Sequence, residues 1–184
     1  MLFRSVINNR QWYVDNNICL YAGADKSVVR IDRAARIVYA QDGTCAAYDR
    51  LLIATGSNPV IPAIPGNDLD GVISFRDIFD VNRMLAYSSS HKRAVVLGGG
   101  LLGLEAANGL VLRGMDVTVI HNNAVLLNRQ MDRQAGEMLQ QELELRGLKF
   151  KMAAKTQQLL GDDNGHITAV RFDDGSVQIG RAHV

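Results

Sequence analysis

The sequence predicts an α/β fold, with a parallel sheet and a β-meander in its second half and a smaller β-rich part before them. Three observations carry this prediction. Between residues 75 and 146, apolar runs of strand length alternate with helical periodicity, which is typical of strand–helix–strand units around a parallel sheet. After residue 147, short strand-like runs are separated by clusters of turn residues, as in a meander. Before residue 56 the pattern is again one of short strands and turns.

The composition is that of a globular protein and argues against several classes of partner. The chain has 184 residues, enough for one large domain or two small ones. A formal net charge of +1 indicates neither a nucleic acid nor a membrane surface as a partner. The longest apolar runs are much shorter than a membrane-spanning helix, and no secretory signal is visible, so we expect a cytoplasmic protein. Cys19 and Cys45 are isolated, so we expect no metal site.

Short elements are expected in the first part of the chain. We predict a helix over 6–17, strands over 18–23 and 51–56, and two strands within 26–43 joined tightly at Asp32–Ala35. All three prolines lie in SNPVIPAIPG, residues 57–66, which excludes a helix and predicts an extended linker. The composition changes there, so we place a domain boundary after residue 70.

Helices and strands alternate in the second part. We predict a helix from Phe75 to Tyr87 ended by three serines, a strand at 94–97, a helix at 101–113, a strand at 117–120 and a helix from the Asp132 cap to about Arg146. The last helix should bury one face, formed by Ala135, Met138, Leu139 and Leu143. Strands at 148–153, 155–160, 166–172 and 176–179, with turns at 162–165 and 173–175, complete the pattern.

A glycine-rich turn joins the strand at 94–97 to the helix that follows. Gly98, Gly100 and Gly103 form G-x-G-x-x-G, in which the first glycine permits the turn, the second lets a pyrophosphate approach, and the third lets helix and strand pack closely. Amides around Leu101 and Leu102 would face the phosphates from the positive end of the helix dipole. In this strand–turn–helix–strand context the motif predicts a Rossmann-like site for a nicotinamide dinucleotide. A glycine-rich turn without a ligand is the alternative.

Two further positions bear on the identity of the dinucleotide. Glu105 is expected in the first turn of the helix, where its charge suits the helix N-terminus, and it could also line the nicotinamide pocket. His121, followed by Asn122 and Asn123, stands where NAD sites carry an acid that binds the adenosine ribose. An imidazole cannot repel a 2′-phosphate, and Arg129 is the nearest cation in sequence. These residues predict a relaxed site that accepts NADH or NADPH, with NADH slightly preferred; the alternative is that His121 merely ends a strand.

The residues 44–66, TCAAYDRLLIATGSNPVIPAIPG, and 94–110, AVVLGGGLLGLEAANGL, resemble the FAD- and NAD(P)-dependent pyridine nucleotide-disulfide oxidoreductase superfamily. Within it, LLGLEAA, VTVIH and LLNRQMDRQAGEMLQQELELRG are most similar to the large subunit of assimilatory NAD(P)H nitrite reductase. Rubredoxin and ferredoxin reductases are similar alternatives.

The resemblance implies roles for matching residues. Thr55 and Gly56 belong to an ATG motif whose backbone passes close to FAD. The resemblance places Glu105 near the nicotinamide and flavin, His121 in the position of the ribose-binding acid, and Arg129 against the adenosine or phosphate part of the cofactor.

The family's first G-x-G-x-x-G unit has no counterpart here. We therefore expect an internal piece of a longer protein: a partial FAD-binding domain at 1–70 that lacks that unit, and an NAD(P)-binding domain at 71–184 that lacks its last strand. FAD would be bound tightly only in the intact protein, and the iron–sulfur and sirohaem centres that the resemblance implies would lie outside this chain. An unpaired sheet edge suggests a homodimer.

The predicted function is to hold NAD(P)H so that its hydride passes to FAD, as in nitrite reductase. Such a transfer depends on positioning, so we assign no catalytic side chain, and we expect the fragment alone to be inactive. Two alternatives stay open: a fragment of a rubredoxin- or ferredoxin-type NAD(P)H reductase, and a nucleotide-binding module without catalysis.

Overall fold

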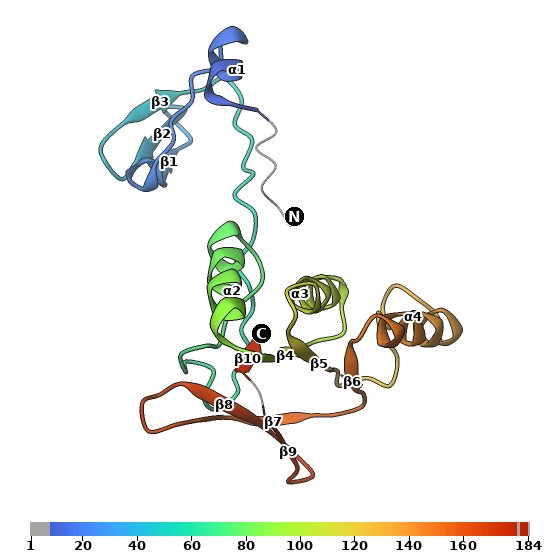
Figure 1. Ribbon diagram of the computed structural model, residues 1–184. Coiled ribbons are helices and arrows are strands. Elements are labelled where there is room, and N and C mark those ends of the chain that lie inside the picture. The colour runs from blue at the N-terminus through green and yellow to red at the C-terminus, as the bar shows by residue number, and fades with distance from the viewer. Residues whose placement is uncertain (1–7, 180, 184) are drawn as a thin grey trace. The chain divides into compact units, whose positions relative to one another are not determined.

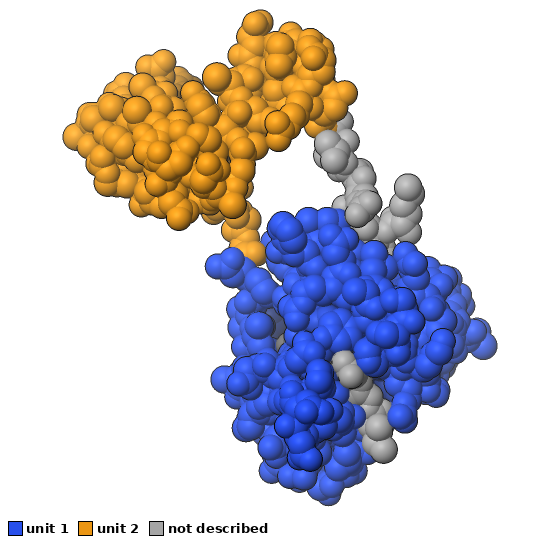
Figure 2. Space-filling view, turned by 60° about the vertical axis from the view of Figure 1, so that its left-hand side comes forward, with its two compact units in different colours: residues 1–3, 58–184 blue, residues 4–57 orange. Residues whose placement is uncertain are grey.

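The computed structural model describes residues 8–179 and 181–183. Internal contacts divide the described residues into two compact units, one within residues 4–57 and the other within residues 58–184 (Figure 2). The domain boundary predicted after residue 70 stays a prediction.

A small antiparallel sheet is the main β structure in the described part of residues 4–57. Its strand order is β1-β2-β3. The elements are α1 (Arg10–Asp15), a 3-10 turn at Ala24–Lys26, β1 (Val28–Asp32), β2 (Ile37–Ala40) and β3 (Cys45–Ala47). The predicted pair of strands with a tight connection is confirmed, and the Asp32 carboxylate accepts the Ala35 amide at 2.9 Å inside that connection.

Three other expectations for this unit need correction. The predicted helix over 6–17 extends only from Arg10 to Asp15, and its residues 6–7 lie outside the described residues. The predicted strands over 18–23 and 51–56 are not strands, and Leu52 and Ile53 are 87% and 66% exposed. A strand requires a neighbouring strand that forms hydrogen bonds with its N–H and C=O groups, and no described strand pairs with either segment. The proline-rich residues 57–64 contain neither helix nor strand, as predicted.

A parallel sheet lies at the centre of residues 58–184, and the predicted Rossmann-like α/β class is confirmed. Its strand order is β10-β4-β5-β6. The sheet and its helices are α2 (Ile78–Ser90), β4 (Arg93–Leu97), α3 (Leu101–Val111), β5 (Asp116–Ile120), α4 (Arg133–Leu145), β6 (Lys149–Lys151) and β10 (Arg181–His183). The predicted meander is also present, as β7 (Thr156–Gly161), β8 (Ile167–Phe172) and β9 (Val177–Ile179).

Three layers result from the alternation of side chains along the parallel strands. Val96 and Val119 belong to the apolar cluster that includes α3 residues, whereas Val95 and Ile120 pack with residues of the meander. Alternate residues of a strand point to opposite faces, so both faces of β4 and β5 are buried. Figure 1 shows α2, α3 and α4 on one side of these strands and β7–β9 on the other.

The ends of α2 differ from the prediction. The helix begins after Asp77, because Asp77 and Asp80 form a capping box. The Asp77 carboxylate accepts the Asp80 amide at 2.9 Å, and the Asp80 carboxylate accepts the Asp77 amide. The helix also continues through Ser88–Ser90, which were expected to end it. Each serine hydroxyl donates to the carbonyl three residues earlier, so the serines stay within the helix.

The outer helix α4 is confirmed with one change. Asp132 caps α4 by accepting the Ala135 amide at 2.8 Å. Leu139 and Leu143 pack against the core, but Met138 is 63% exposed and does not belong to the buried face.

The parallel sheet contains one strand that was not predicted. The sequence patterns predicted no strand after residue 179, whereas β10 pairs in parallel with β4 through Ala182 and Val95.

Candidate dinucleotide-binding site

The predicted site residues of the second unit gather where β4 and β5 end. Leu97 and Ile120, the last residues of these strands, are register partners, so both strands end at the same edge of the sheet. The glycine turn leaves β4 there, and residues 121–131 leave β5 there. Ligands of open α/β sheets bind outside the carboxyl ends of the strands, which makes this edge the candidate site.

The glycine turn has the geometry that its sequence predicts. Gly98 has a φ of +120°, a conformation that side chains disfavour, and its amide donates to the Ile120 carbonyl at 2.8 Å. A Cβ on Gly103 would lie 2.0 Å from the carbonyl oxygen of Gly98, so α3 packs against the turn at backbone distance. A Cβ on Gly100 would meet nothing within 4 Å, so the space in front of Gly100 is open to a ligand.

The first turn of α3 faces this open space without a cap. Gly100 is the N-cap residue and provides no side-chain hydrogen bond to the helix, while Leu101 and Leu102 are 59% and 46% exposed. Uncapped amides at a helix N-terminus favour an anion such as a phosphate. Glu105 is exposed but, contrary to expectation, does not lie in the first turn, which contains no acidic residue. Because the helix begins at Leu101, Glu105 belongs to its second turn.

His121 is buried at the end of β5 and is held there by its backbone and its ring. Its amide donates to the Lys151 carbonyl at 2.9 Å, and its carbonyl accepts the Ala154 amide at 3.0 Å. The ring nitrogen Nδ1 accepts the Gly99 amide at 3.2 Å, and the residue is only 8% exposed. The ring therefore lies under the glycine turn rather than in solvent.

The segment after β5 also contributes to the site. Leu126 is fully buried and Leu127 nearly so, and the Leu127 amide donates to the Gly99 carbonyl at 3.1 Å. Leu127 has a φ of +50°, which is rare for a residue with a side chain and points to a conformation imposed by its surroundings. Arg129 and Asn122 are exposed.

Two cavities flank His121, and neither is lined by a carboxylate. The first, of about 400 Å³, is lined by Gly100, His121, Asn122, Asn123, Leu127, Asn128, Arg129 and Gln130. The second, of about 320 Å³, is lined by Pro62, Ile64, Leu97, Gly98, Ile120, His121, Asn122, Ala154, Lys155 and Thr156. Arg129 in the first cavity and Lys155 in the second are the cationic residues of these linings, so the electrostatics suit a phosphate-bearing ligand.

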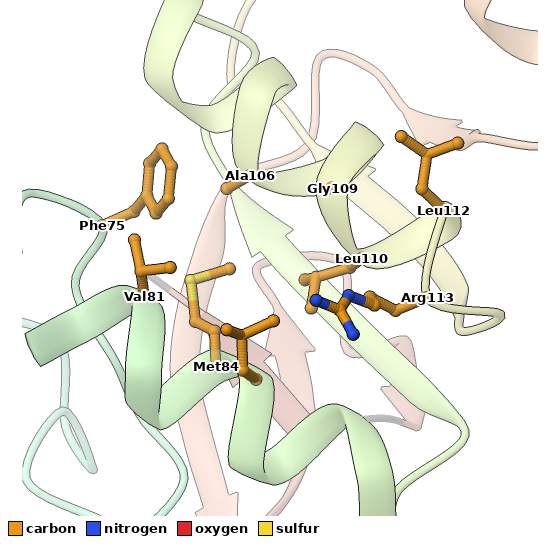
Figure 3. Close-up of a pocket in the computed structure, with 9 residues that line it drawn as sticks. Phe75, Val81, Met84, Ala106, Gly109, Leu110, Leu112 and Arg113 are labelled. Carbon is orange, nitrogen blue, oxygen red and sulfur yellow. The ribbon is translucent and has the colours of Figure 1, made fainter. Parts of the chain in front are cut away.

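A third hollow lies away from the glycine turn, between α2 and α3. Figure 3 shows Val81 and Met84 of α2 facing Ala106 and Leu110 of α3, with Phe75 at one end. It measures about 100 Å³ and its lining is mainly apolar. It has no helix N-terminus and no residue of the glycine turn, so it does not belong to the candidate dinucleotide site.

Several other residues bear on the completeness of the site. Thr55 and Gly56 belong to the other compact unit, where both are exposed and Gly56 has a φ of +72°. Gly99, Leu127 and Asn128 were not predicted. The unbroken run of three glycines was a signal for Gly99, but the contribution of residues 127–128 depends on how the segment after β5 folds back.

The described part of the chain shows no metal centre and no spanning helix. In residues 8–179 and 181–183, no group of three or more His, Cys, Asp or Glu side chains is placed to hold a metal ion. Among the helices described, none combines the length and apolar character that crossing a bilayer requires.

Comparison with known proteins gives this site a family context. The family model described as pyridine nucleotide-disulphide oxidoreductase matches residues 10–182. Nitrite reductase [NAD(P)H] of Bacillus subtilis is 46% identical over 170 residues, covering 92% of this chain and 21% of that protein. Rubredoxin-NAD(+) reductase of Pseudomonas putida is 32% identical over 164 residues, covering 89% of this chain and 42% of that protein. The chain thus spans less than half the length of either relative.

A solved structure supports the same fold. The ferredoxin reductase from Rhodopseudomonas palustris superposes with a TM-score of 0.87 at 21% identity, covering 96% of this chain and 43% of that one. The family match over almost the whole chain and the identity to curated relatives agree with the glycine turn and the parallel sheet. The chain belongs to the pyridine nucleotide-disulphide oxidoreductase family.

Proposed function

We propose that this chain is the NAD(P)H-binding part of a flavin-dependent reductase of the nitrite reductase type. The observation that carries the proposal is the open space at Gly100, bounded by the uncapped start of α3 and by a cavity without a carboxylate. A pyrophosphate fits such a place because backbone amides and one cation can face its charge. The similarity to nitrite reductase of Bacillus subtilis supports the choice within the family.

The residues of this chain would act by binding and orientation. The amides of Leu101 and Leu102 would bind the pyrophosphate, Asn122 and Arg129 would lie along the adenosine part, and Glu105 would lie toward the nicotinamide. Bound NAD(P)H supplies a hydride and the flavin accepts it. This transfer needs the two rings to be held in contact rather than a side chain that moves a proton, so we propose no catalytic residue.

We propose a smaller share in the flavin site. Around Gly56 the backbone is exposed, and a Cβ on that residue would meet nothing within 4 Å, so a flavin could approach the chain closely there. Thr55 and Gly56 would then supply backbone contacts to FAD in the intact protein. An iron–sulfur or sirohaem centre would be bound by other parts of that protein, because the described residues offer no ligand cluster.

Calorimetric titration of the 184-residue chain with NADH and with NADPH tests the binding function. We expect both to bind with comparable affinity. The decisive variant is Gly100→Val, because its side chain would enter open space in the free protein but would occupy the place of the pyrophosphate. Binding of both dinucleotides should then be lost while the thermal unfolding temperature stays close to that of the wild type. Unchanged binding by Gly100→Val would contradict the proposal.

A rubredoxin-type reductase is a second candidate, favoured by the similarity to rubredoxin-NAD(+) reductase of Pseudomonas putida. The intact protein decides between the two: NADH-dependent reduction of nitrite supports the first, and reduction of rubredoxin without nitrite reduction supports the second. A nucleotide-binding module without catalysis would bind NADH but would reduce no acceptor dye with FAD present.

A further inference from the structure

His121 lines both cavities, but the two nitrogens of its imidazole are buried. Nδ1 accepts the Gly99 amide at 3.2 Å inside the protein. Nε2 is also buried, and it has no hydrogen-bond partner among the residues that the structure describes. Neither nitrogen is therefore placed to reach a ribose hydroxyl or a phosphate at the surface of the cavity.

The contact with Gly99 also defines the state of the ring. A ring nitrogen that accepts a hydrogen bond carries no hydrogen, so the single proton of this imidazole is on Nε2 and the ring is neutral. A neutral ring neither attracts nor repels a 2′-phosphate by charge. In this geometry His121 cannot do what the ribose-binding acid of an NAD site does.

Three residues, Leu126, Leu127 and His121, surround Gly99 closely. Its carbonyl accepts the Leu127 amide at 3.1 Å, and a Cβ at this position would lie 2.6 Å from Leu126 Cδ2 and 3.0 Å from His121 Cγ. The hydrogen bond that the Gly99 amide donates to His121 fixes the peptide before Gly99. The hydrogen bond that the Gly99 carbonyl accepts from Leu127 fixes the peptide that bears the Gly100 amide. The orientation of the turn in front of the open space thus depends on the imidazole.

We propose that His121 is a positioning residue of the dinucleotide site. As a neutral imidazole it holds the Gly99 amide and so orients the turn that faces the pyrophosphate, and it contributes equally to NADH and NADPH binding. The discrimination between NADH and NADPH at the 2′ position depends on the exposed residues after His121. Among them, Arg129 is the charged side chain that lines the first cavity. This inference rests on the proposed function, because it concerns the same ligand.

Two variants separate positioning from recognition of the 2′ group. His121→Asn places its amide oxygen one bond from Cγ, as Nδ1 is, and keeps an acceptor for Gly99. His121→Gln reaches one bond further, toward the position of Nε2, and lacks that acceptor. We expect Asn to rescue binding to within about threefold of wild type, and Gln to weaken NADH and NADPH alike by roughly tenfold, the scale of one lost hydrogen bond. The ratio of the two affinities should not change in either variant.

The outcomes distinguish this inference from the proposed function. A several-fold change in the NADPH to NADH ratio in either variant shows that His121 reads the 2′ group, and undiminished binding by His121→Gln shows that the contact with Gly99 has no role; both overturn the inference and leave the proposed function standing. Failure of the folded wild-type chain to bind either dinucleotide overturns the proposed function. Nitrogen NMR of the wild type gives an answer without ligand, because a hydrogen on Nδ1 would contradict the positioning role.

Discussion

The closest backbone approach in the site lies between α3 and the glycine turn, and Gly103→Ala probes it. An added Cβ would lie 2.0 Å from the Gly98 carbonyl oxygen, whereas Cβ atoms essentially never approach a non-bonded heavy atom more closely than 3.0 Å. The difference, 3.0 minus 2.0 Å, means that α3 or the turn must move by at least 1.0 Å. No rotation of a side chain can relieve the contact, because the opposing atom belongs to the backbone.

The size of the effect follows from two opposing terms. Overpacking that displaces backbone costs up to about 3 kcal/mol, and replacing a helical glycine by alanine returns about 1 kcal/mol. The net loss in the free energy of unfolding is about 2 kcal/mol, which lowers the melting temperature of a chain of this size by roughly 4–8 °C. Because the displaced turn includes Gly100, dinucleotide binding should weaken as well.

Thermal unfolding followed by circular dichroism measures this loss, with calorimetric titration of NADH beside it. Gln141→Ala on the exposed face of α4 is the matched control, since an exposed helical position should change stability by less than about 0.5 kcal/mol. A Gly103→Ala protein that melts at or above the wild-type temperature would refute the argument that helix and turn meet at backbone distance.

Two further predictions concern the core and the charged surface. Leu126→Ala should lower the free energy of unfolding by about 2–5 kcal/mol in urea denaturation, because Leu126 is fully buried beneath the turn; a loss below about 1 kcal/mol would contradict its packing. The hydrogen bond from the Lys26 ammonium, with help from Thr44, lowers the pKa of Asp42 from 3.8 to about 2. A lowered carboxylate pKa stabilises the fold above pH 3.8, and this contribution is lost as the pH falls toward 2. NMR titration should show this pKa, and Lys26→Met should raise it toward 3.8; no rise would mean that the ion pair is screened at this exposed site.

Local chemistry explains where sequence-based prediction worked. The Asp132 cap and the glycine turn depend on residues close in sequence, and apolar runs separated by a helical segment indicated the parallel strands β4 and β5; all were predicted. The expected strands at 18–23 and 51–56 failed because a strand exists only with a partner, and apolar character alone does not provide one. The prediction that the serines end α2 was wrong, because their hydroxyls donate hydrogen bonds to carbonyls within the helix.

The sequence by itself determined the Rossmann-like class, the strand–turn–helix order and the place of the candidate site, because each depends on periodicity or on the steric needs of glycine. Only the tertiary structure decided what His121 contacts, since its ring meets Gly99, a residue 22 positions away, across two strands that the sheet brings side by side. The contribution of Leu127 and Asn128 was decided in the same way, because the segment after β5 folds back to the glycine turn, where the Leu127 amide donates to the Gly99 carbonyl. Contacts between distant segments depend on the whole fold, and no local pattern encodes them.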